Sequence, residues 1–467
     1  MPETDLQRTA LFIAVLAGFI TPFDLSAVNI ALPTIGSEFS MDAISLSWVS
    51  TAYLLAAGIL LVPFGRIADM YGRKKIFATG LALFLIASSA MLFSVSSPMV
   101  ILLRLVQGSG AALIFGTSVA ILTEVTPVTG RGKALGIYTT AVYTGLSLGP
   151  FIGGFLTQHF GWRSIFLINV PIGIFSLILI TLYLKGEWAG SKGETFDLGG
   201  AIEYGLTLVF VMYGFSLLPA REGIILLVAG AVMLLVFVAR ELRLSSPLMD
   251  IALWTKNRPF AFSNLAALIN YSATFSITFF MSLYLQYVRG FDPGYAGAIL
   301  VIQPVMQALL SPFAGRLSDR IPPGRIASAG MALTAAGLIA LAFISDTTPV
   351  LHIMAILAVI GIGFGFFSSP NTNAVMSSVP KKSLGVASGT LGTMRLVGQM
   401  LSMGIATMII AICIGRIEIT ASEHGQLLTS VMAGFGIFAL LCLVGIVFSL
   451  VRCAQAPPTG ASARPGE

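Results

Sequence analysis

Long apolar runs, separated by short polar segments, follow one another along the chain from residue 10 to residue 451. A helix rises about 1.5 Å per residue, so an apolar run of about twenty residues crosses the hydrocarbon core of a bilayer. Transmembrane strands alternate apolar and polar side chains over about ten residues, and these runs do not alternate. The pattern therefore predicts an all-helical polytopic membrane protein with fourteen spans, at residues 10–31, 46–65, 76–94, 98–123, 133–157, 164–184, 198–218, 223–239, 260–287, 294–315, 326–344, 350–375, 384–411 and 427–451.

Composition agrees with this prediction. Hydrophobic residues make up 56% of the 467 residues and charged residues only 10%, whereas about a quarter of a soluble domain is charged. This excludes a soluble enzyme and a nucleic-acid-binding domain, so no nucleic acid is expected as a partner. The three cysteines and three histidines are widely separated, which predicts neither a disulfide framework nor a metal site.

Basic residues are distributed very unevenly between the predicted loops. Of the 26 lysines and arginines, 20 fall on one side of the predicted membrane, 4 on the other and 2 within spans. Cytoplasmic loops carry the excess of lysine and arginine, so both termini are predicted to be cytoplasmic. The first apolar run is too long for the core of a signal peptide. We therefore expect a multi-pass protein of the cell (inner or plasma) membrane, in contact with the lipid bilayer.

Two short matches indicate an internal repeat. The segment Gly65–Asp69 (GRIAD) reappears 250 residues later as Gly315–Asp319 (GRLSD), and Lys133–Gly136 matches Lys382–Gly385 at an offset of 249. Two matches at nearly one offset predict two pseudo-symmetric six-helix bundles with two additional helices between them. The expected limits are 1–187 for the first bundle, 188–245 for the central pair, 246–455 for the second bundle and 456–467 for a disordered cytoplasmic tail.

Six motifs carry a family resemblance. They are DLSAVNIALP at 24–33, WVSTAYL at 48–54, GRIADMYGRKK at 65–75, RLVQGSG at 104–110, GLSLGPFIGG at 145–154, and WRSIF followed by NVPIG at 162–173. The loop at 65–75 resembles the signature of the major facilitator superfamily, and the set is similar to the fourteen-helix drug:proton antiporters. The resemblance covers almost the whole chain. It implies a proton-coupled exporter that works by alternating access, with no cofactor besides the proton, a small amphipathic substrate, and a monomeric state.

Asp24 and Arg104 are the charged residues deepest in the first predicted bundle. Each lies about 10 Å from the outer end of its span, so their depths match. A carboxylate inside a membrane requires a partner or a proton, and pairing and desolvation shift its protonation in opposite directions. We therefore predict that this pair couples proton movement to transport. The alternative is a fixed ion pair that only holds spans 1 and 4 together.

The loop after span 2 is predicted to act as a cytoplasmic gate. Gly65 and Gly72 are expected to permit close helix approach, and Arg73 is expected to pair with Glu124 at the inner end of span 4. By the family resemblance, Asp69 faces the start of span 13, near Ser383, where the helix dipole favours a carboxylate. The alternative is a loop that only anchors the chain at the headgroups.

Glycines recur at intervals of four in span 5, where the resemblance implies an antiporter motif. Small residues at this spacing allow close helix contact. We expect a packed seam between the bundles, with a kink allowed by the proline. The motif comprises Gly145, Gly149, Pro150, Gly153 and Gly154.

Polar and aromatic residues inside spans are candidates for a substrate cavity, although helix contact remains the alternative for each of them. They are Asn29, Trp48, Tyr53, Gln107, Asn264, Tyr271, Thr274, Thr278, Gln303, Gln307 and Arg395. Arg395 lies deep in span 13 with no deep carboxylate in its own bundle. Its expected partners are Asp24 across the cavity, backbone carbonyls or an anionic group of the substrate, and a structural role is equally open.

The sequence thus favours a proton-coupled exporter of hydrophobic or amphipathic compounds, of the multidrug-efflux type. A dedicated exporter of a metabolite or of a lipid-like anion is the first alternative. A membrane receptor or enzyme without a transport cycle is the second, but the chain shows no nucleophile–base cluster and no large extramembrane domain. We therefore expect no enzymatic activity.

Overall fold

The computed structural model describes residues 3–127, 130–190, 196–244, 248–249, 251–318, 320–380 and 384–454, and within these ranges the regular structure is helical apart from one isolated β-bridge. The predicted all-helical class is confirmed. The helices are α1 (Glu3–Glu38), α2 (Ala43–Tyr71), α3 (Arg73–Met91), α4 (Ser97–Val125), α5 (Arg131–Phe160), α6 (Arg163–Leu182), α7 (Leu198–Leu217), α8 (Arg221–Glu241), α9 (Ile251–Lys256), α10 (Arg258–Thr274), α11 (Ser276–Leu283), the π-helix η1 (Tyr284–Val288), α12 (Pro293–Leu300), α13 (Ile302–Ser318), α14 (Pro323–Leu341), α15 (Val350–Ser377), α16 (Leu384–Cys413), the 3₁₀-helix η3 (Ala421–Glu423) and α17 (His424–Ala454).

The predicted spans coincide with these helices. Among the described residues, thirteen helices or continuous helical runs are long and apolar enough to cross a membrane. The remaining predicted span, 133–157, lies in the thirty-residue helix α5, which is less apolar because it contains many glycine, threonine and tyrosine residues. The predicted span 260–287 is not one regular helix. It is divided into α10, α11 and η1, with a break at Phe275.

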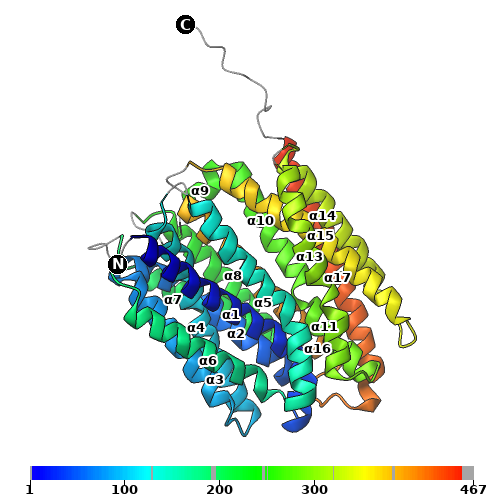
Figure 1. The fold of residues 1–467 in the computed structure, drawn as a ribbon. Coiled ribbons are helices and arrows are strands. Elements are labelled where there is room, and N and C mark those ends of the chain that lie inside the picture. Colours follow the sequence, from blue (N-terminus) through cyan, green and yellow to red (C-terminus); the bar gives the residue numbers. More distant parts are fainter. Residues whose placement is uncertain are drawn as a thin grey trace.

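Helix pairing is duplicated between the two parts of the chain (Figure 1). In the first bundle α1 packs on α5, α2 on α4 and α3 on α6; in the second, α10 packs on α16, α13 on α15 and α14 on α17. The bundles α1–α6 and α10–α17 are therefore related as the sequence repeat predicted. Asp319 of the repeated loop, Lys382 and Ser383 of the second match, and the predicted tail 456–467 lie outside the described residues.

The bundles are joined at one end of the molecule. The start of α1 and the end of α17 lie at the same end of the molecule, which we call the terminal end, and the opposite end is the far end (Figure 1). Near the far end, hydrogen bonds cross from one bundle to the other, namely Ala43 N to Ile417 O at 2.9 Å, Gly294 N to Gln158 Oε1 at 3.1 Å and Gln286 Nε2 to Ile30 O at 2.9 Å. The far end is thus closed by direct contact between the bundles.

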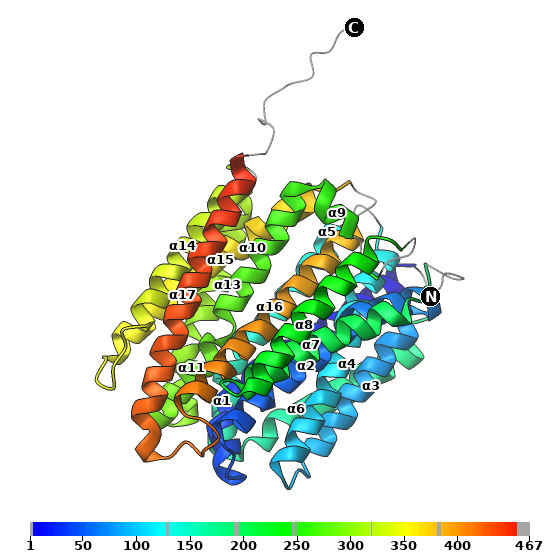
Figure 2. The same cartoon turned by 180° about the vertical axis from the view of Figure 1, so that it is seen from behind.

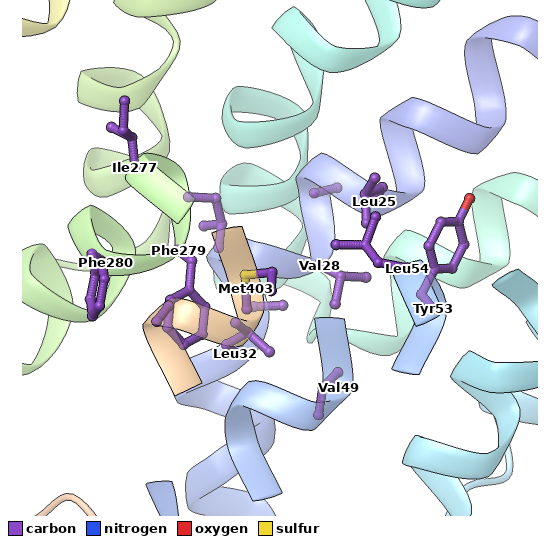
Figure 3. Packing of buried hydrophobic residues seen from close by; sticks show 14 of the residues in the cluster. Leu25, Val28, Leu32, Val49, Tyr53, Leu54, Ile277, Phe279, Phe280 and Met403 are labelled. Carbon is purple, nitrogen blue, oxygen red and sulfur yellow. The ribbon is translucent and has the colours of Figure 1, made fainter. Parts of the chain in front are cut away.

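Apolar side chains of both bundles share one core cluster (Figure 3). Leu32 of α1 lies in this cluster with Phe279 of α11 and Met403 of α16, and all three are fully buried. The contacts follow from the pairing of α1 with α11 and of α2 with α16. Between membrane-spanning helices such contacts stabilise through van der Waals packing, because lipid chains are as apolar as these side chains.

The two additional helices, α7 and α8, lie beside the contact between α2 and α16 (Figure 2). The Tyr204 hydroxyl of α7 donates a hydrogen bond to the backbone oxygen of Gly58 in α2, at 3.1 Å. On the other side, a Cβ added at Gly404 of α16 would come within 2.6 Å of Phe215 in α7. Helix α7 therefore covers the seam between α2 and α16, whereas α8 packs on α7 and leaves side chains such as Leu235 exposed.

Candidate functional site

A pocket lies between the two bundles and is lined by residues of both. Its volume is about 90 Å³, well below the 300–1,000 Å³ of typical small-molecule sites, so a drug-sized ligand requires the bundles to move apart. The first bundle contributes Ser26, Asn29, Tyr143, Leu146 and Pro150, and the second contributes Tyr271, Thr274, Phe275, Thr278, Gln303, Pro304, Gln307, Phe364, Arg395 and Gln399.

Seven of the eleven predicted cavity residues line this pocket, namely Asn29, Tyr271, Thr274, Thr278, Gln303, Gln307 and Arg395. The other four lie elsewhere. Trp48 packs edge-on against Tyr213 of α7 with ring centroids 6.3 Å apart, and Asn264 donates to the backbone oxygen of Phe260 at 2.9 Å. Tyr53 and Gln107 are buried inside the first bundle.

Asn264 lies in the same helix as Tyr271, α10, so the break at Phe275 does not separate the two residues. Asn264 comes seven residues before Tyr271, about 10 Å along the axis, and so lies beyond the pocket. After the break, the chain widens into η1 at Tyr284. The Ser282 hydroxyl accepts a hydrogen bond from Gln286 at 3.0 Å instead of lining the pocket.

Asp24 and Arg104 form the predicted ion pair. Asp24 Oδ2 lies 2.5 Å from Arg104 Nη1, and both side chains are fully buried. The other carboxylate oxygen, Oδ1, accepts hydrogen bonds from Gln107 Nε2 at 3.0 Å and from Asn169 Nδ2 at 2.8 Å. All three neighbours donate to the carboxyl group, so this arrangement fits its ionised form.

Arg104 is held by further contacts. Its Nε donates to the backbone oxygen of Val49 at 3.1 Å, and its guanidinium lies 4.4 Å from the centroid of the Tyr53 ring. The Tyr53 hydroxyl points away from the apolar cluster in Figure 3 and donates to the backbone oxygen of Thr21 at 3.3 Å. The five helices α1, α2, α3, α4 and α6 therefore meet at this charge pair, with Ser88 of α3 bonded to Gln107 at 2.9 Å.

The charge pair does not line the pocket. Helix α1 nevertheless connects the two, because Asp24 points into the bundle while Ser26 and Asn29 of the same helix line the pocket. Asn169, a donor to Asp24, was not among the predicted site residues. Its sequence signal was an amide within the apolar span 164–184, which is unusual at membrane depth.

The loop between α2 and α3 has the predicted charge contacts. Arg73 Nε lies 2.7 Å from Asp69 Oδ1, and Arg73 Nη1 lies 3.2 Å from Glu124 Oε2. The pairing of Arg73 with Glu124 is therefore confirmed. Ser383, near the start of the helix that Asp69 was expected to face, lies outside the described residues.

The two glycines of this loop differ in their roles. Gly72 has a φ of +124°, a region that favours glycine, and an added Cβ would approach the Glu187 carboxyl group within 2.5 Å. At Gly65 an added Cβ would meet no atom within 4 Å, so the space there does not require glycine, although α4 does approach this position, where a Cβ added at Gly116 would lie 3.7 Å from Gly65 Cα. The sequence also gave no sign of Glu187, whose carboxylate accepts from the backbone N–H of Lys74 at 2.8 Å, in the first turn of α3.

Three of the four α5 glycines face α1 of their own bundle, and this corrects the predicted seam. Added Cβ atoms at Gly145, Gly149 and Gly153 would lie 2.4 to 2.7 Å from atoms of Phe19, Ser26 and Ala27. Only Gly154 faces the other bundle, where its Cβ would lie 2.3 Å from the Pro293 backbone oxygen. A fifth glycine, Gly297 of α12, approaches the backbone oxygen of Pro150, with an added Cβ at 2.2 Å. On this side of the molecule, the contact between the bundles is therefore formed by α5 and α12 together.

Arg395 lines the pocket between two tyrosine rings. Its guanidinium carbon lies 5.3 Å from the centroid of Tyr271 and 5.8 Å from that of Tyr143, which belongs to the other bundle. The expected partner Asp24 is excluded, because that carboxylate is bonded to Arg104, Gln107 and Asn169. Within the described ranges, Arg395 forms no ion pair and its buried Nε has no hydrogen-bond partner.

Two duplicated six-helix bundles around a polar pocket define a membrane transporter of the kind built from internal repeats. The chain belongs to the Major Facilitator Superfamily, whose family model matches residues 14–403 and, in a second match, 263–466. This is a family of transporters and not of enzymes, and its fold agrees with the all-helical arrangement of the described residues.

Relatives named as transporters support the same family. The chain is 27% identical over 448 residues to the riboflavin transporter RibZ of Clostridioides difficile, a match that covers 95% of this chain and 97% of that protein. It is 29% identical over 415 residues to the multidrug resistance protein Stp of Mycobacterium tuberculosis, covering 87% and 77%. A solved bacterial homolog of the human lysosomal transporter Spinster, in an inward-facing and unoccupied conformation, matches with a TM-score of 0.69 and 16% identity over 96% of this chain and 97% of that chain.

Proposed function

We propose that this protein is a proton-coupled exporter of amphipathic compounds, of the fourteen-helix drug:proton antiporter branch. The observation that carries the proposal is the pocket between the bundles, to which both bundles contribute side chains. A site shared by two bundles changes its access when the bundles rock against each other. Several relatives, including Stp, are named as multidrug resistance proteins, which favours export of foreign compounds.

Alternating access is supported by the contacts at the far end. Hydrogen bonds such as that from Ala43 N to Ile417 O close this end, so a route to the pocket has to open from the terminal end. With both termini in the cytoplasm, as the distribution of basic residues favours, this conformation is inward-facing. We propose that the protein lies in the cell membrane, and the family resemblance favours a monomer.

Proton coupling is assigned to Asp24. Binding of a proton removes the negative charge that balances Arg104 and converts a group that accepts three hydrogen bonds into one that also donates. The contacts of α1 with α4 and α6 then have to rearrange. Because α1 also carries Ser26 and Asn29, this rearrangement reaches the pocket and links protonation to substrate binding.

The experiment is reconstitution in proteoliposomes with an imposed pH gradient. The purified protein should concentrate an amphipathic dye only while the gradient is present, and substrate addition should move protons in the opposite direction. Collapse of the gradient with a protonophore is the matched control. Accumulation that persists after this collapse would refute proton coupling, and lack of transport of any amphipathic compound would refute the exporter.

A further inference from the structure

The pocket between the bundles carries one kind of charge. Among its described lining residues, Arg395 is the only charged side chain, and none is an aspartate or a glutamate. The remaining lining groups are amides, hydroxyls, aromatic rings and aliphatic groups. An exporter of organic cations would benefit from a carboxylate in its pocket, and the described lining provides a guanidinium instead.

No acidic side chain among the described residues pairs with Arg395, whose guanidinium interacts with the neutral Tyr271 side chain instead. Its buried Nε has no hydrogen-bond partner, and the nearest aromatic groups are the neutral rings of Tyr143 and Tyr271. Placing a charge at membrane depth is unfavourable unless a counter-charge or a hydrogen-bonding group compensates it. Asp24 is unable to compensate it, because that carboxylate is buried among three donors in the first bundle.

We propose that the pocket takes anionic aromatic compounds, whose acidic group binds Arg395 and whose flat ring system lies against Tyr143 and Tyr271. The two tyrosines come from different bundles, so a ring held by both also contacts both moving parts. Phe275 and Phe364 extend the aromatic lining, and Gln303, Gln307 and Gln399 offer amides to carbonyl or hydroxyl groups of the substrate. This inference rests on the proposed exporter function and specifies its substrate class.

Binding of an anionic substrate by Arg395 and a purely structural role of Arg395 have different consequences. A guanidinium binds a carboxylate or phosphate through two parallel hydrogen bonds, and that mode needs free N–H groups directed at the ligand. Arg395 Nε has no hydrogen-bond partner among the described residues, and the Arg395 side chain lines the pocket. If Arg395 only held the two bundles together through the tyrosine rings, its replacement would lower the melting temperature without altering the preference for substrate charge.

The test uses two dyes with the same xanthene core and opposite charge, carboxyfluorescein as the anion and rhodamine 123 as the cation. Binding to the purified full chain is measured by fluorescence polarisation, and transport is measured in proteoliposomes with a pH gradient. We expect the anion to bind roughly ten- to hundredfold more tightly than the cation. Arg395→Gln should remove most of this preference, and Arg395→Lys should retain part of it, because a positive charge remains.

Arg416→Gln is the matched control, since it removes one arginine from an exposed position between α16 and α17. It should leave the dye preference unchanged. Equal or tighter binding of rhodamine 123, unaffected by Arg395→Gln, overturns the inference while proton-driven transport of that dye leaves the exporter in place. Failure of both dyes to bind overturns the inference alone, whereas the exporter is refuted only if no amphipathic compound is transported under a pH gradient. A lower melting temperature of Arg395→Gln with an unchanged charge preference assigns the residue a structural role.

Discussion

Asp24 and Arg104, eighty residues apart in the chain, form a fully buried ion pair of 2.5 Å that does not line the pocket between the bundles. Removal of one partner from such a pair leaves a buried charge and typically costs about 3–5 kcal/mol. We therefore expect Asp24→Asn and Arg104→Gln, made singly, each to give a strongly lowered melting temperature. The double variant, which removes both charges, should recover most of the loss.

The double variant also distinguishes proton coupling by Asp24 from a purely structural role of the Asp24–Arg104 pair. If Asp24 carries the proton, the folded double variant still binds substrate but no longer concentrates it when a pH gradient is imposed. Its substrate affinity should also be the same at two pH values, unlike that of the unaltered protein. Concentrative, gradient-driven transport by the double variant would show that the pair only holds α1 and α4 together.

The contact of Asp69 with Arg73 leads to a prediction about the loop between α2 and α3. Both residues are partly exposed, and exposed ion pairs contribute about 0–1 kcal/mol, so Asp69→Asn should leave the melting temperature nearly unchanged. We expect it to slow transport while substrate affinity is retained, because the loop affects conformational change without touching the pocket. Glu124→Gln, on the more exposed partner of Arg73, should have the smaller effect. Normal transport by Asp69→Asn favours an anchoring loop.

Glycines on different sides of α5 should respond differently to substitution. Gly149→Val places a side chain against Ser26 inside the first bundle, and overpacking of this kind costs about 1–3 kcal/mol of stability. Gly297→Val instead pushes α12 away from Pro150 of the other bundle, which opposes closure of the far end. We expect the first variant to lose folded protein and the second to fold with an altered conformational equilibrium.

Chemical labelling of a pocket residue measures the equilibrium between conformations in which the far end is closed and conformations in which it is open. A cysteine at Asn29, in a background without Cys413, Cys442 and Cys453, lies in the pocket. In cells, a membrane-impermeant maleimide added outside should label this cysteine faster when Gly297→Val is present. An unchanged rate would mean that the approach of α12 to α5 does not control access from the far end.

The predicted orientation of the protein in the membrane follows from the distribution of lysine and arginine between the loops, and it is tested separately. Reporter tags at both termini and in the loops near Lys74 and Lys256 should all be read as cytoplasmic, because 20 basic residues lie on that side and only 4 on the other. Tags beside Arg221 and Arg416 serve as the opposite-side controls. An external reading for the C-terminus would contradict the count of fourteen spans and the inward-facing assignment.

Hydrophobic run length was sufficient to predict the helices, because a bilayer restricts the chain to nearly straight apolar segments. Their duplication was predicted from two repeated motifs at nearly one offset. Matching depths in two spans were sufficient to pair Asp24 with Arg104. The donors to Asp24 were not predicted in full, since Asn169 comes from a span whose rotation depends on packing against α1 and α3. Helical rotation in a bundle is a tertiary property that local periodicity does not determine.

The prediction of the pocket residues depended on depth along a helix as well as on the face of the helix. Gln303 and Gln307 lie one turn apart on α13 and both line the pocket. Asn264 does not, because it lies two turns before Tyr271 on α10, at a different depth. The glycines of α5 show a further limit. Their spacing indicates close packing, but helices on both sides of α5 approach closely, and spacing alone does not identify which helix faces each glycine.

The contact of α2 with α16 and the pseudo-symmetric contact of α5 with α12 differ in their exposure to lipid, because α7 covers only the first. Tyr204 and its neighbours on α7 cover the contact of α2 with α16, whereas the related contact of α5 with α12 presents the exposed side chains Phe151, Phe155 and Tyr295. Amphipathic compounds partition into the bilayer before they meet a transporter. A solute that diffuses sideways within the membrane therefore meets helix α7 at one contact between the bundles and exposed aromatic side chains at the other, so the two sides of the protein present different surfaces to it.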